Sequence, residues 1–131
     1  MATNSAEKIA APARRGDLVV IERVEHDCTI GRDYKATLQF DVMVVSNIFR
    51  DGRIKAVRRV NDNNDDPGQP IDRMVGFSYG YLIAAASVDK AAVIEAVRAH
   101  HWPGYPGLLK SFDSLDEVKA IIQPHRHSNA A

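Results

Sequence analysis

The stretch ATLQFDVMVVSNIFRDGRIKAVRRV, residues 36–60, decides the fold. Leu38, Phe40, Val42 and Val44 alternate with more polar residues, and the chain then becomes apolar on both faces around Val45. Alternation with a period of two is typical of a half-buried β-strand. A strand that is apolar first on one face and then on both predicts a long, bent strand shared between two packed layers. A bulge over residues 42–45 would produce that bend.

Asp51-Gly52 separates this strand from a second strand-like run. The Asp-Gly pair suits the positive φ values of a type I′ turn and therefore predicts a two-residue hairpin loop. Counting outward from that loop pairs Arg50 with Arg53 and Phe49 with Ile54. The second strand then has two rows of side chains: Ile54, Ala56, Arg58 and Val60 on one face, and Arg53, Lys55, Val57 and Arg59 on the other.

The remaining elements follow from apolar patterning and capping residues. Residues 17–24 and 74–86 read as strands, and the polar residues 25–35 and 61–72 read as loops. Ser87 is expected to cap a helix that runs to about residue 101. Ser114 and Glu117 form a capping box for a second helix that ends at Pro124.

These elements predict an α+β domain over residues 16–124. Its core would be a small, strongly bent antiparallel sheet or an SH3-like partial barrel, with two short C-terminal helices. An open sheet covered by helices on one face is the alternative. Residues 1–15 are expected to form a disordered N-terminal tail, and residues 125–131 a frayed C-terminal tail.

Composition restricts the classes of function. The chain has 131 residues, and its 17 lysines and arginines balance 17 aspartates and glutamates. A neutral chain has no global field that would draw it to nucleic acid or to a membrane, so a charged partner needs a local patch. A single cysteine is typical of a reducing cytosol. No leader-like segment or long apolar run is evident, so we expect a cytoplasmic protein without a membrane partner.

Motifs for common enzyme classes are absent from the sequence. It contains no GxGxxG or GxxxxGK[ST] phosphate loop, no GxSxG elbow and no HExxH pair. Cys28 with His26 and with His100-His101 could supply zinc ligands or a nucleophile and base, but no standard ligand spacing is present. Glu25 and Asp27 also flank the thiol with negative charge, where a reactive thiolate needs a positive environment. We therefore expect no metal and no cofactor, and a small cysteine- or metal-dependent enzyme is the least favoured function.

The strongest functional signal is a cluster of cations around the hairpin. Five lie within ten residues, and Asp51 is the only acidic residue among them. A basic hairpin can enter a nucleic-acid groove or follow a phosphate backbone. A charged edge strand that prevents aggregation is the structural alternative, as is neutralisation by the acidic loop that follows. The leading hypothesis is a non-catalytic accessory or regulatory module that binds nucleic acid through Arg50, Arg53, Lys55, Arg58 and Arg59.

Trp102 and Tyr105 give a second signal, in the proline- and glycine-rich connection HHWPGYPG. Exposed aromatic residues on a rigid loop make good binding anchors. The alternative, which the sequence favours, packs both rings between helix and sheet. The second hypothesis is therefore a protein–protein adaptor, with a homodimer as one form of it, that binds through Trp102 and Tyr105. Phe77, Tyr79 and Tyr81 alternate along one strand and could stack on bases, although packing is the commoner fate of such a row.

Overall fold

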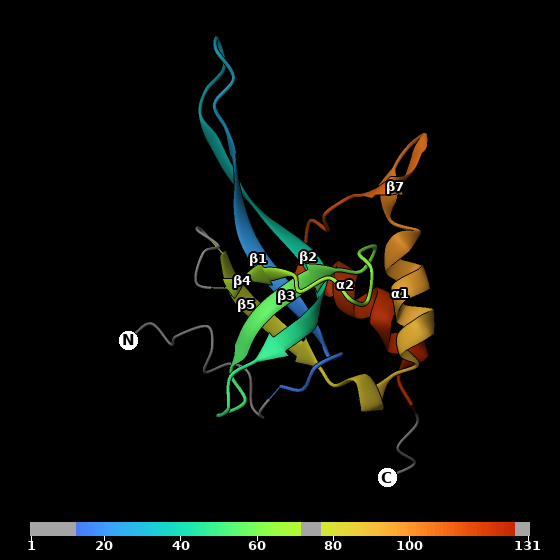
Figure 1. Cartoon of the computed structure of the whole chain (residues 1–131). Helices are drawn as coiled ribbons and strands as arrows, with labels where there is room; N and C mark the ends of the chain where they lie inside the picture. The colour runs from blue at the N-terminus through green and yellow to red at the C-terminus, as the bar shows by residue number, and fades with distance from the viewer. Residues whose placement is uncertain (1–12, 72–76, 128–131) are drawn as a thin grey trace.

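The computed structural model describes residues 13–71 and 77–127. They form seven strands, two α-helices and short 3₁₀ turns (Figure 1). The strands are β1 (Leu18–Asp27), β2 (Lys35–Ile48), β3 (Ile54–Arg59), β4 (Gln69–Pro70), β5 (Phe77–Ile83), β6 (His101–Trp102) and β7 (Tyr105–Leu109). The helices are α1 (Lys90–Arg98) and α2 (Leu115–Ile122), with 3₁₀ turns η3 (Ala85–Ser87) and η4 (Gln123–His125).

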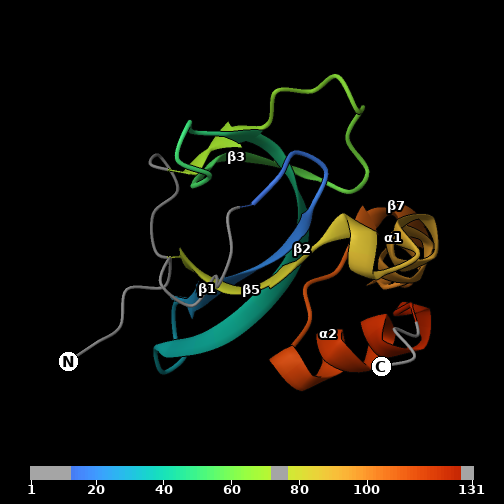
Figure 2. The same ribbon diagram turned by 90° about the horizontal axis from the view of Figure 1, so that it is seen from below.

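Five of the strands form one antiparallel sheet in the order β4-β3-β2-β1-β5, and β6 and β7 form a separate small sheet. The large sheet curls strongly and stays open on one side, as the view from below shows (Figure 2). Both helices lie outside the curl. The predicted α+β class, with a bent antiparallel sheet and two short C-terminal helices, is confirmed.

The sheet separates two hydrophobic cores, as the pattern of β2 predicts. Val42 and Val44 belong to the core beneath the helices, whereas Val45 belongs to the core inside the curl. Strand β1 follows the same alternation, so one strand contributes to both cores. The outer core includes Leu18, Val20, Phe40, Val93, Val97, Phe112, Val118 and Ile122, and the inner core is Ala13, Val19, Ile21, Val45, Ile54 and Val57.

The first hairpin extends much further than the sequence indicates. Residues 25–27 were expected in a loop, but β1 and β2 stay paired as far as Asp27 opposite Lys35. The described part of β5 begins opposite Arg23 and β3 ends opposite Met43, so among the described residues only β1 and β2 pair in the outer part of this hairpin. We call residues 24–38 the first arm. It projects away from the body of the molecule (Figure 1).

The turn between β2 and β3 differs from the predicted type I′ loop. Phe49 N donates to Arg53 O at 2.8 Å, Gly52 N donates to Phe49 O at 3.0 Å, and Gly52 has φ of 89°. These bonds define a three-residue loop with a left-handed glycine at its end. Asp51 Oδ1 stabilises it by accepting from Arg53 N at 3.0 Å. The bulge expected at residues 42–45 lies nearer the turn, where the β2–β3 register shifts between residues 45 and 48.

Each α-helix has a side-chain N-cap, and the N-cap of α1 differs from the residue that the sequence predicts. Ser114 caps α2 as predicted, because its side chain accepts from Glu117 N at 3.1 Å. Helix α1 is capped by Asp89 and not by Ser87, whose hydroxyl instead donates to Ala84 O in the preceding 3₁₀ turn. The helix also ends earlier than predicted, at Arg98, with Ala99 as its C-cap, and β6 begins at His101.

Packed structure extends beyond the predicted domain boundaries at both ends. Ala13 is only 2% exposed, and its N–H donates to Gly52 O at 3.0 Å. At the other end, His125 O accepts from Asp89 N at 2.8 Å, and His127 N donates to Ser87 O at 3.0 Å. Residues 1–12 and 128–131 of the predicted tails lie outside the described residues.

Asp17 joins three parts of the fold through one buried carboxylate. The residue is 6% exposed, its Oδ2 accepts from Arg14 N and its Oδ1 accepts from Ala85 N, both at 2.9 Å. Its main-chain oxygen accepts from Val45 N at 2.8 Å. The N-terminal segment, β2 and the turn before α1 therefore meet at this residue.

Replacing Asp17 with alanine should leave two main-chain N–H groups without their acceptors. An unsatisfied buried group costs about 1–3 kcal/mol and these two are partly buried, so we expect the free energy of unfolding to fall by roughly 1–3 kcal/mol in urea titrations. Asp65→Ala, in the exposed loop after β3, is the matched control and should change stability by less than about 0.5 kcal/mol. Equal effects of the two substitutions would contradict the role assigned to Asp17.

Candidate functional site

The five predicted basic residues do not share one surface. Arg50, Arg53 and Lys55 are exposed at the turn between β2 and β3. Arg58 is only 8% exposed, and its Nη2 donates to Asn64 Oδ1 at 2.9 Å, which fixes the loop after β3. Arg59 is exposed but lines a cleft at the far end of the strand. Arg58 and Arg59 therefore lie apart from the surface that Arg50, Arg53 and Lys55 share.

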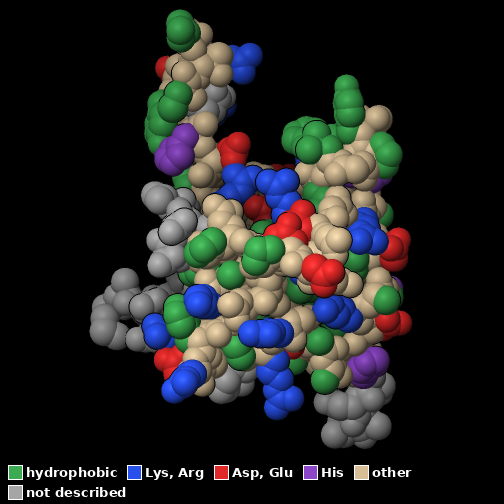
Figure 3. All heavy atoms as spheres, in the orientation of Figure 1, with side chains coloured by type: hydrophobic (Ala, Val, Ile, Leu, Met, Phe, Trp, Pro, Cys, Tyr) green, Lys and Arg blue, Asp and Glu red, His purple; other side chains and the backbone are tan. Residues whose placement is uncertain are grey.

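Two other cations take their place. The bond from Ala13 N to Gly52 O brings the N-terminal segment beside the hairpin turn, and Arg14 and Arg15 are both exposed there. Arg15 Nη2 also donates to Asn47 Oδ1 at 3.1 Å. Lys and Arg side chains gather at this lower part of the molecule (Figure 3). We call this surface the basic end; it consists of Arg14, Arg15, Arg50, Arg53 and Lys55.

The basic end carries a strong local charge in a neutral protein. Among its described exposed side chains, the five cations are opposed by the carboxylate of Asp51 alone, which leaves a net charge of +4. The Arg53 backbone N–H, and then its guanidinium at 2.7 Å, lower the pKa of Asp51, so this carboxylate stays ionised. It pairs with Arg53, and within the part of the chain that the structure describes no carboxylate forms an ion pair with the other four cations.

An exposed aromatic ring lies within the basic end. Phe49 is 40% exposed, with the Arg53 guanidinium 4.8 Å and the Lys55 ammonium 5.8 Å from the ring centroid. Cations beside an accessible ring are typical of surfaces that bind single-stranded nucleic acid, where bases stack and phosphates are neutralised.

A second surface is the cleft at the opposite end of the molecule. The hairpin of β6 and β7, residues 101–109, forms a second arm that turns at Pro103-Gly104, where Gly104 has φ of 81°. A cleft of about 760 Å³ lies between the bases of the two arms. The space-filling view shows the hollow between them (Figure 3).

A polar network forms part of the floor of this cleft. Arg23 Nε donates to Asp41 Oδ2 and Arg23 Nη2 to Ser111 Oγ, both at 2.8 Å. Ser111 Oγ in turn donates to Asp41 Oδ1 at 2.5 Å, and Arg23 pairs with Glu25. Burial alone would lower the pKa of Arg23, but the hydrogen bonds and charges of Asp41 and Glu25 outweigh it and raise that pKa. This cation therefore stays charged and paired.

The aromatic residues of the second arm are exposed, so the expected packing between helix and sheet is wrong. Tyr105 is 66% and Trp102 47% exposed, and Lys110 Nζ lies 5.1 Å from the Trp102 ring centroid. Pro-Gly is a turn signal in its own right, and between two aromatic residues it could have revealed this hairpin. The other large apolar side chains exposed on the arms are Val24, Ile30, Tyr34, Leu38 and Leu108.

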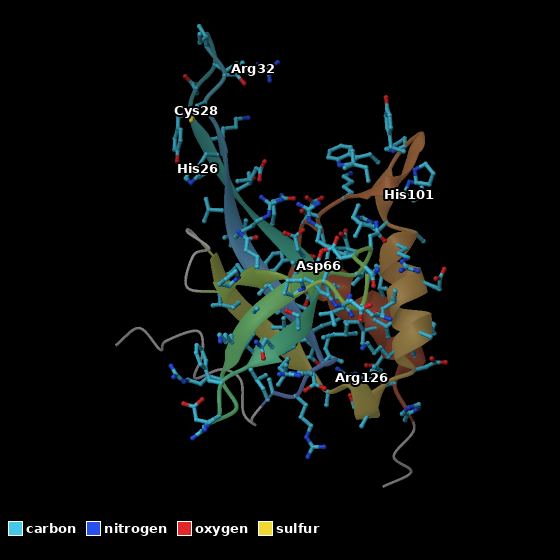
Figure 4. The ribbon with its side chains drawn as sticks, viewed as in Figure 1. His26, Cys28, Arg32, Asp66, His101 and Arg126 are labelled. Atoms are coloured by element: carbon cyan, nitrogen blue, oxygen red, sulfur yellow. The ribbon has the colours of Figure 1, made fainter. Side chains whose placement is uncertain are left out.

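The candidate catalytic and metal-binding residues lie on separate elements. His26 and Cys28 are on the first arm and His101 is on the second (Figure 4). His26 stacks on Tyr34, while His100 stacks on Phe112 at 4.0 Å. Within residues 13–71 and 77–127, no group of three or more His, Cys, Asp or Glu side chains is placed to hold a metal ion.

The structure describes only part of the aromatic row on β5, which consists of Phe77, Tyr79 and Tyr81. The side chains of Phe77 and Tyr79 lie outside the described residues. Tyr81 packs against the outer core, and Arg126, labelled in Figure 4, hydrogen-bonds its hydroxyl. Tyr81 therefore has a structural role.

Comparison with known proteins does not assign the chain to a family. No protein-family model matches it, and no curated protein or solved structure is significantly similar to it. In the part of the chain that the structure describes, no helix is long and apolar enough to cross a membrane.

The contrast between Arg58 and Arg59 can be tested by stability. Arg58→Ala should lower the free energy of unfolding by about 1–2 kcal/mol, because the carbonyls and the amide that it bonds in the 59–64 loop lose a charged donor. Arg59→Ala should have almost no effect, since its guanidinium is exposed. Urea denaturation of both variants measures this, and a greater loss for Arg59→Ala would contradict the assignment.

Proposed function

We propose that this protein is a non-catalytic nucleic-acid-binding accessory protein that binds through its basic end. The observation that carries the proposal is the pairing of Ala13 with Gly52, which joins two cationic segments that are far apart in the sequence. Electrostatic attraction to phosphates supplies most of non-specific binding. A local charge of +4 on a neutral chain provides that attraction at one end only.

Most of the described acidic residues lie elsewhere, which supports this orientation. The loop after β3 holds Asp62, Asp65 and Asp66, and helix α2 begins with Asp116 and Glu117. A nucleic acid that approaches the basic end meets one ionised carboxylate, Asp51, already paired with Arg53. Long-range steering then orients the protein as well as attracting it.

Phe49 points to single strands as the preferred ligand. A duplex hides the faces of its bases, whereas an unpaired base can stack on an exposed ring, and such stacking is worth about 1–3 kcal/mol per base. The cationic groups of Arg53 and Lys55 lie over the Phe49 ring, so a base that stacks there must displace them towards its neighbouring phosphates. Sequence preference should be weak, since stacking is available to every base.

Salt dependence tests the electrostatic part of the proposal. With four phosphate contacts and about −0.7 per phosphate, the slope of log K against log salt on single-stranded DNA should be roughly −3. Changing Arg14, Arg15, Arg50 and Lys55 to glutamine should bring that slope close to zero. The assay is fluorescence anisotropy with labelled oligonucleotides from low to physiological salt.

A matched variant separates local charge from net charge. Changing Arg32, Lys35, Arg59 and Lys119 to glutamine removes the same four charges from other exposed positions and should leave the slope unchanged. Equal effects of the two quadruple variants, or no binding by the wild type at low salt, would rule out the basic end as the binding surface.

Stacking has its own test. Phe49→Leu keeps an apolar side chain but removes the aromatic face, so affinity for single-stranded oligonucleotides should fall about tenfold, within the 1–3 kcal/mol expected of one stacked base. Affinity for duplex DNA should barely change, because that binding depends on phosphates. Parallel anisotropy titrations with single- and double-stranded forms of one sequence measure both. A parallel loss on both forms would show that Phe49 supports the turn and does not stack.

A further inference from the structure

The two arms expose large apolar side chains in a way that the packing of one copy does not explain. Ile30, at the tip of the first arm, is 99% exposed, and Leu108 on the second arm is 54% exposed. Both arms rise from the same end of the molecule with the cleft between them (Figures 1 and 3). Exposed apolar patches of this kind, rimmed by polar residues, mark interaction surfaces.

We propose that the cleft receives the first arm of a second copy of this chain, so that two copies form a two-fold symmetric dimer by exchanging arms. In such a dimer each copy presents the same surface to the other, which must contain both the inserted part and the recess that receives it. Here the projecting arm and the cleft lie side by side on one end of the molecule.

The extent of the surface suits a stable dimer. The first arm comprises residues 24–38 and the second arm residues 101–109, and their combined length falls within the roughly 20–30 residues that each partner contributes to a standard interface. Aromatic residues and leucine or isoleucine supply the apolar part of both arms. The polar floor of the cleft lies where the tip of an inserted arm would end.

Charges on the arm tip complement charges in the cleft. Arg32 and Asp33 are neighbours at the exposed tip, and Arg59 and Asp62 are both found in the lining of the cleft. Among the described residues, the Arg59 guanidinium has no carboxylate partner, and it can pair with Asp33 of a second copy. The chain also has no net charge, so two copies meet without the mutual repulsion that keeps charged proteins apart.

The arm carries a natural reporter of this contact. Cys28, the only cysteine of the chain, is exposed on the first arm in a single copy (Figure 4). Inserting the arm into a second copy would cover it. The rate at which a thiol reagent labels Cys28 should therefore fall as the protein concentration rises and the dimer forms.

Molar mass gives the direct test. For wild-type protein freed of nucleic acid, sedimentation equilibrium should give about twice the 14.5 kDa of one chain at micromolar concentrations. Ile30→Asp and Leu108→Asp, one on each arm, should give single chains with native circular dichroism and Cys28 labelling that no longer depends on concentration. Phe49→Asp, an exposed apolar position at the basic end, is the matched control and should remain a dimer.

A charge exchange tests the geometry of insertion. Asp33→Arg should weaken the dimer at least tenfold, and combining it with Arg59→Asp should restore most of that loss. A wild type of 14.5 kDa at every concentration up to about a millimolar would overturn the proposal. So would dimers that survive both arm substitutions, or labelling of Cys28 that is equally fast in the dimer.

Discussion

The whole structure depends on the burial of β1 on both faces. Its residues from Leu18 to Ile21 are at most 2% exposed, although successive side chains of a strand point in opposite directions. A strand in that position needs a hydrophobic layer on each side and a neighbouring strand along each edge. β2 and β5 provide the edges, the helices cover one face, and the rest of the sheet must curl back to cover the other. The bend of the sheet, the placement of the two helices and the open side of the curl all follow from this requirement.

The basic end is a secondary result of the same arrangement. Because Asp17 stands immediately before the buried part of β1, its carboxylate can hold Arg14 N while its main-chain oxygen holds Val45 N. The chain ahead of β1 is thus directed along β2 towards the hairpin turn. Folding the core places Arg14 and Arg15 beside Arg50, although nothing in those arginines themselves would bring them together.

The sequence predicts those parts of the fold that face a core. The alternation of Phe40, Val42 and Val44, followed by apolar Val45 on the other face, correctly indicates two layers. Ser114 correctly marks the start of α2. Prediction from the sequence fails where water lies on both sides of a strand. The first arm has no regular alternation of apolar residues, so residues 25–27 resemble a loop. Asp51-Gly52 is compatible with two loop lengths, and only the observed register decides between them. The burial of Arg58 and the position of Arg14 depend on contacts between distant segments, which local patterns do not contain.

The length of β2 gives the molecule a mechanical property. Its 14 residues, Lys35–Ile48, form one bent strand from the first arm to the turn of the basic end, with a contour length of roughly 45 Å at about 3.3 Å per residue. An extended backbone is already close to its maximum length and has almost no slack. The first arm and the hairpin turn are therefore joined by one covalent path whose length can change very little.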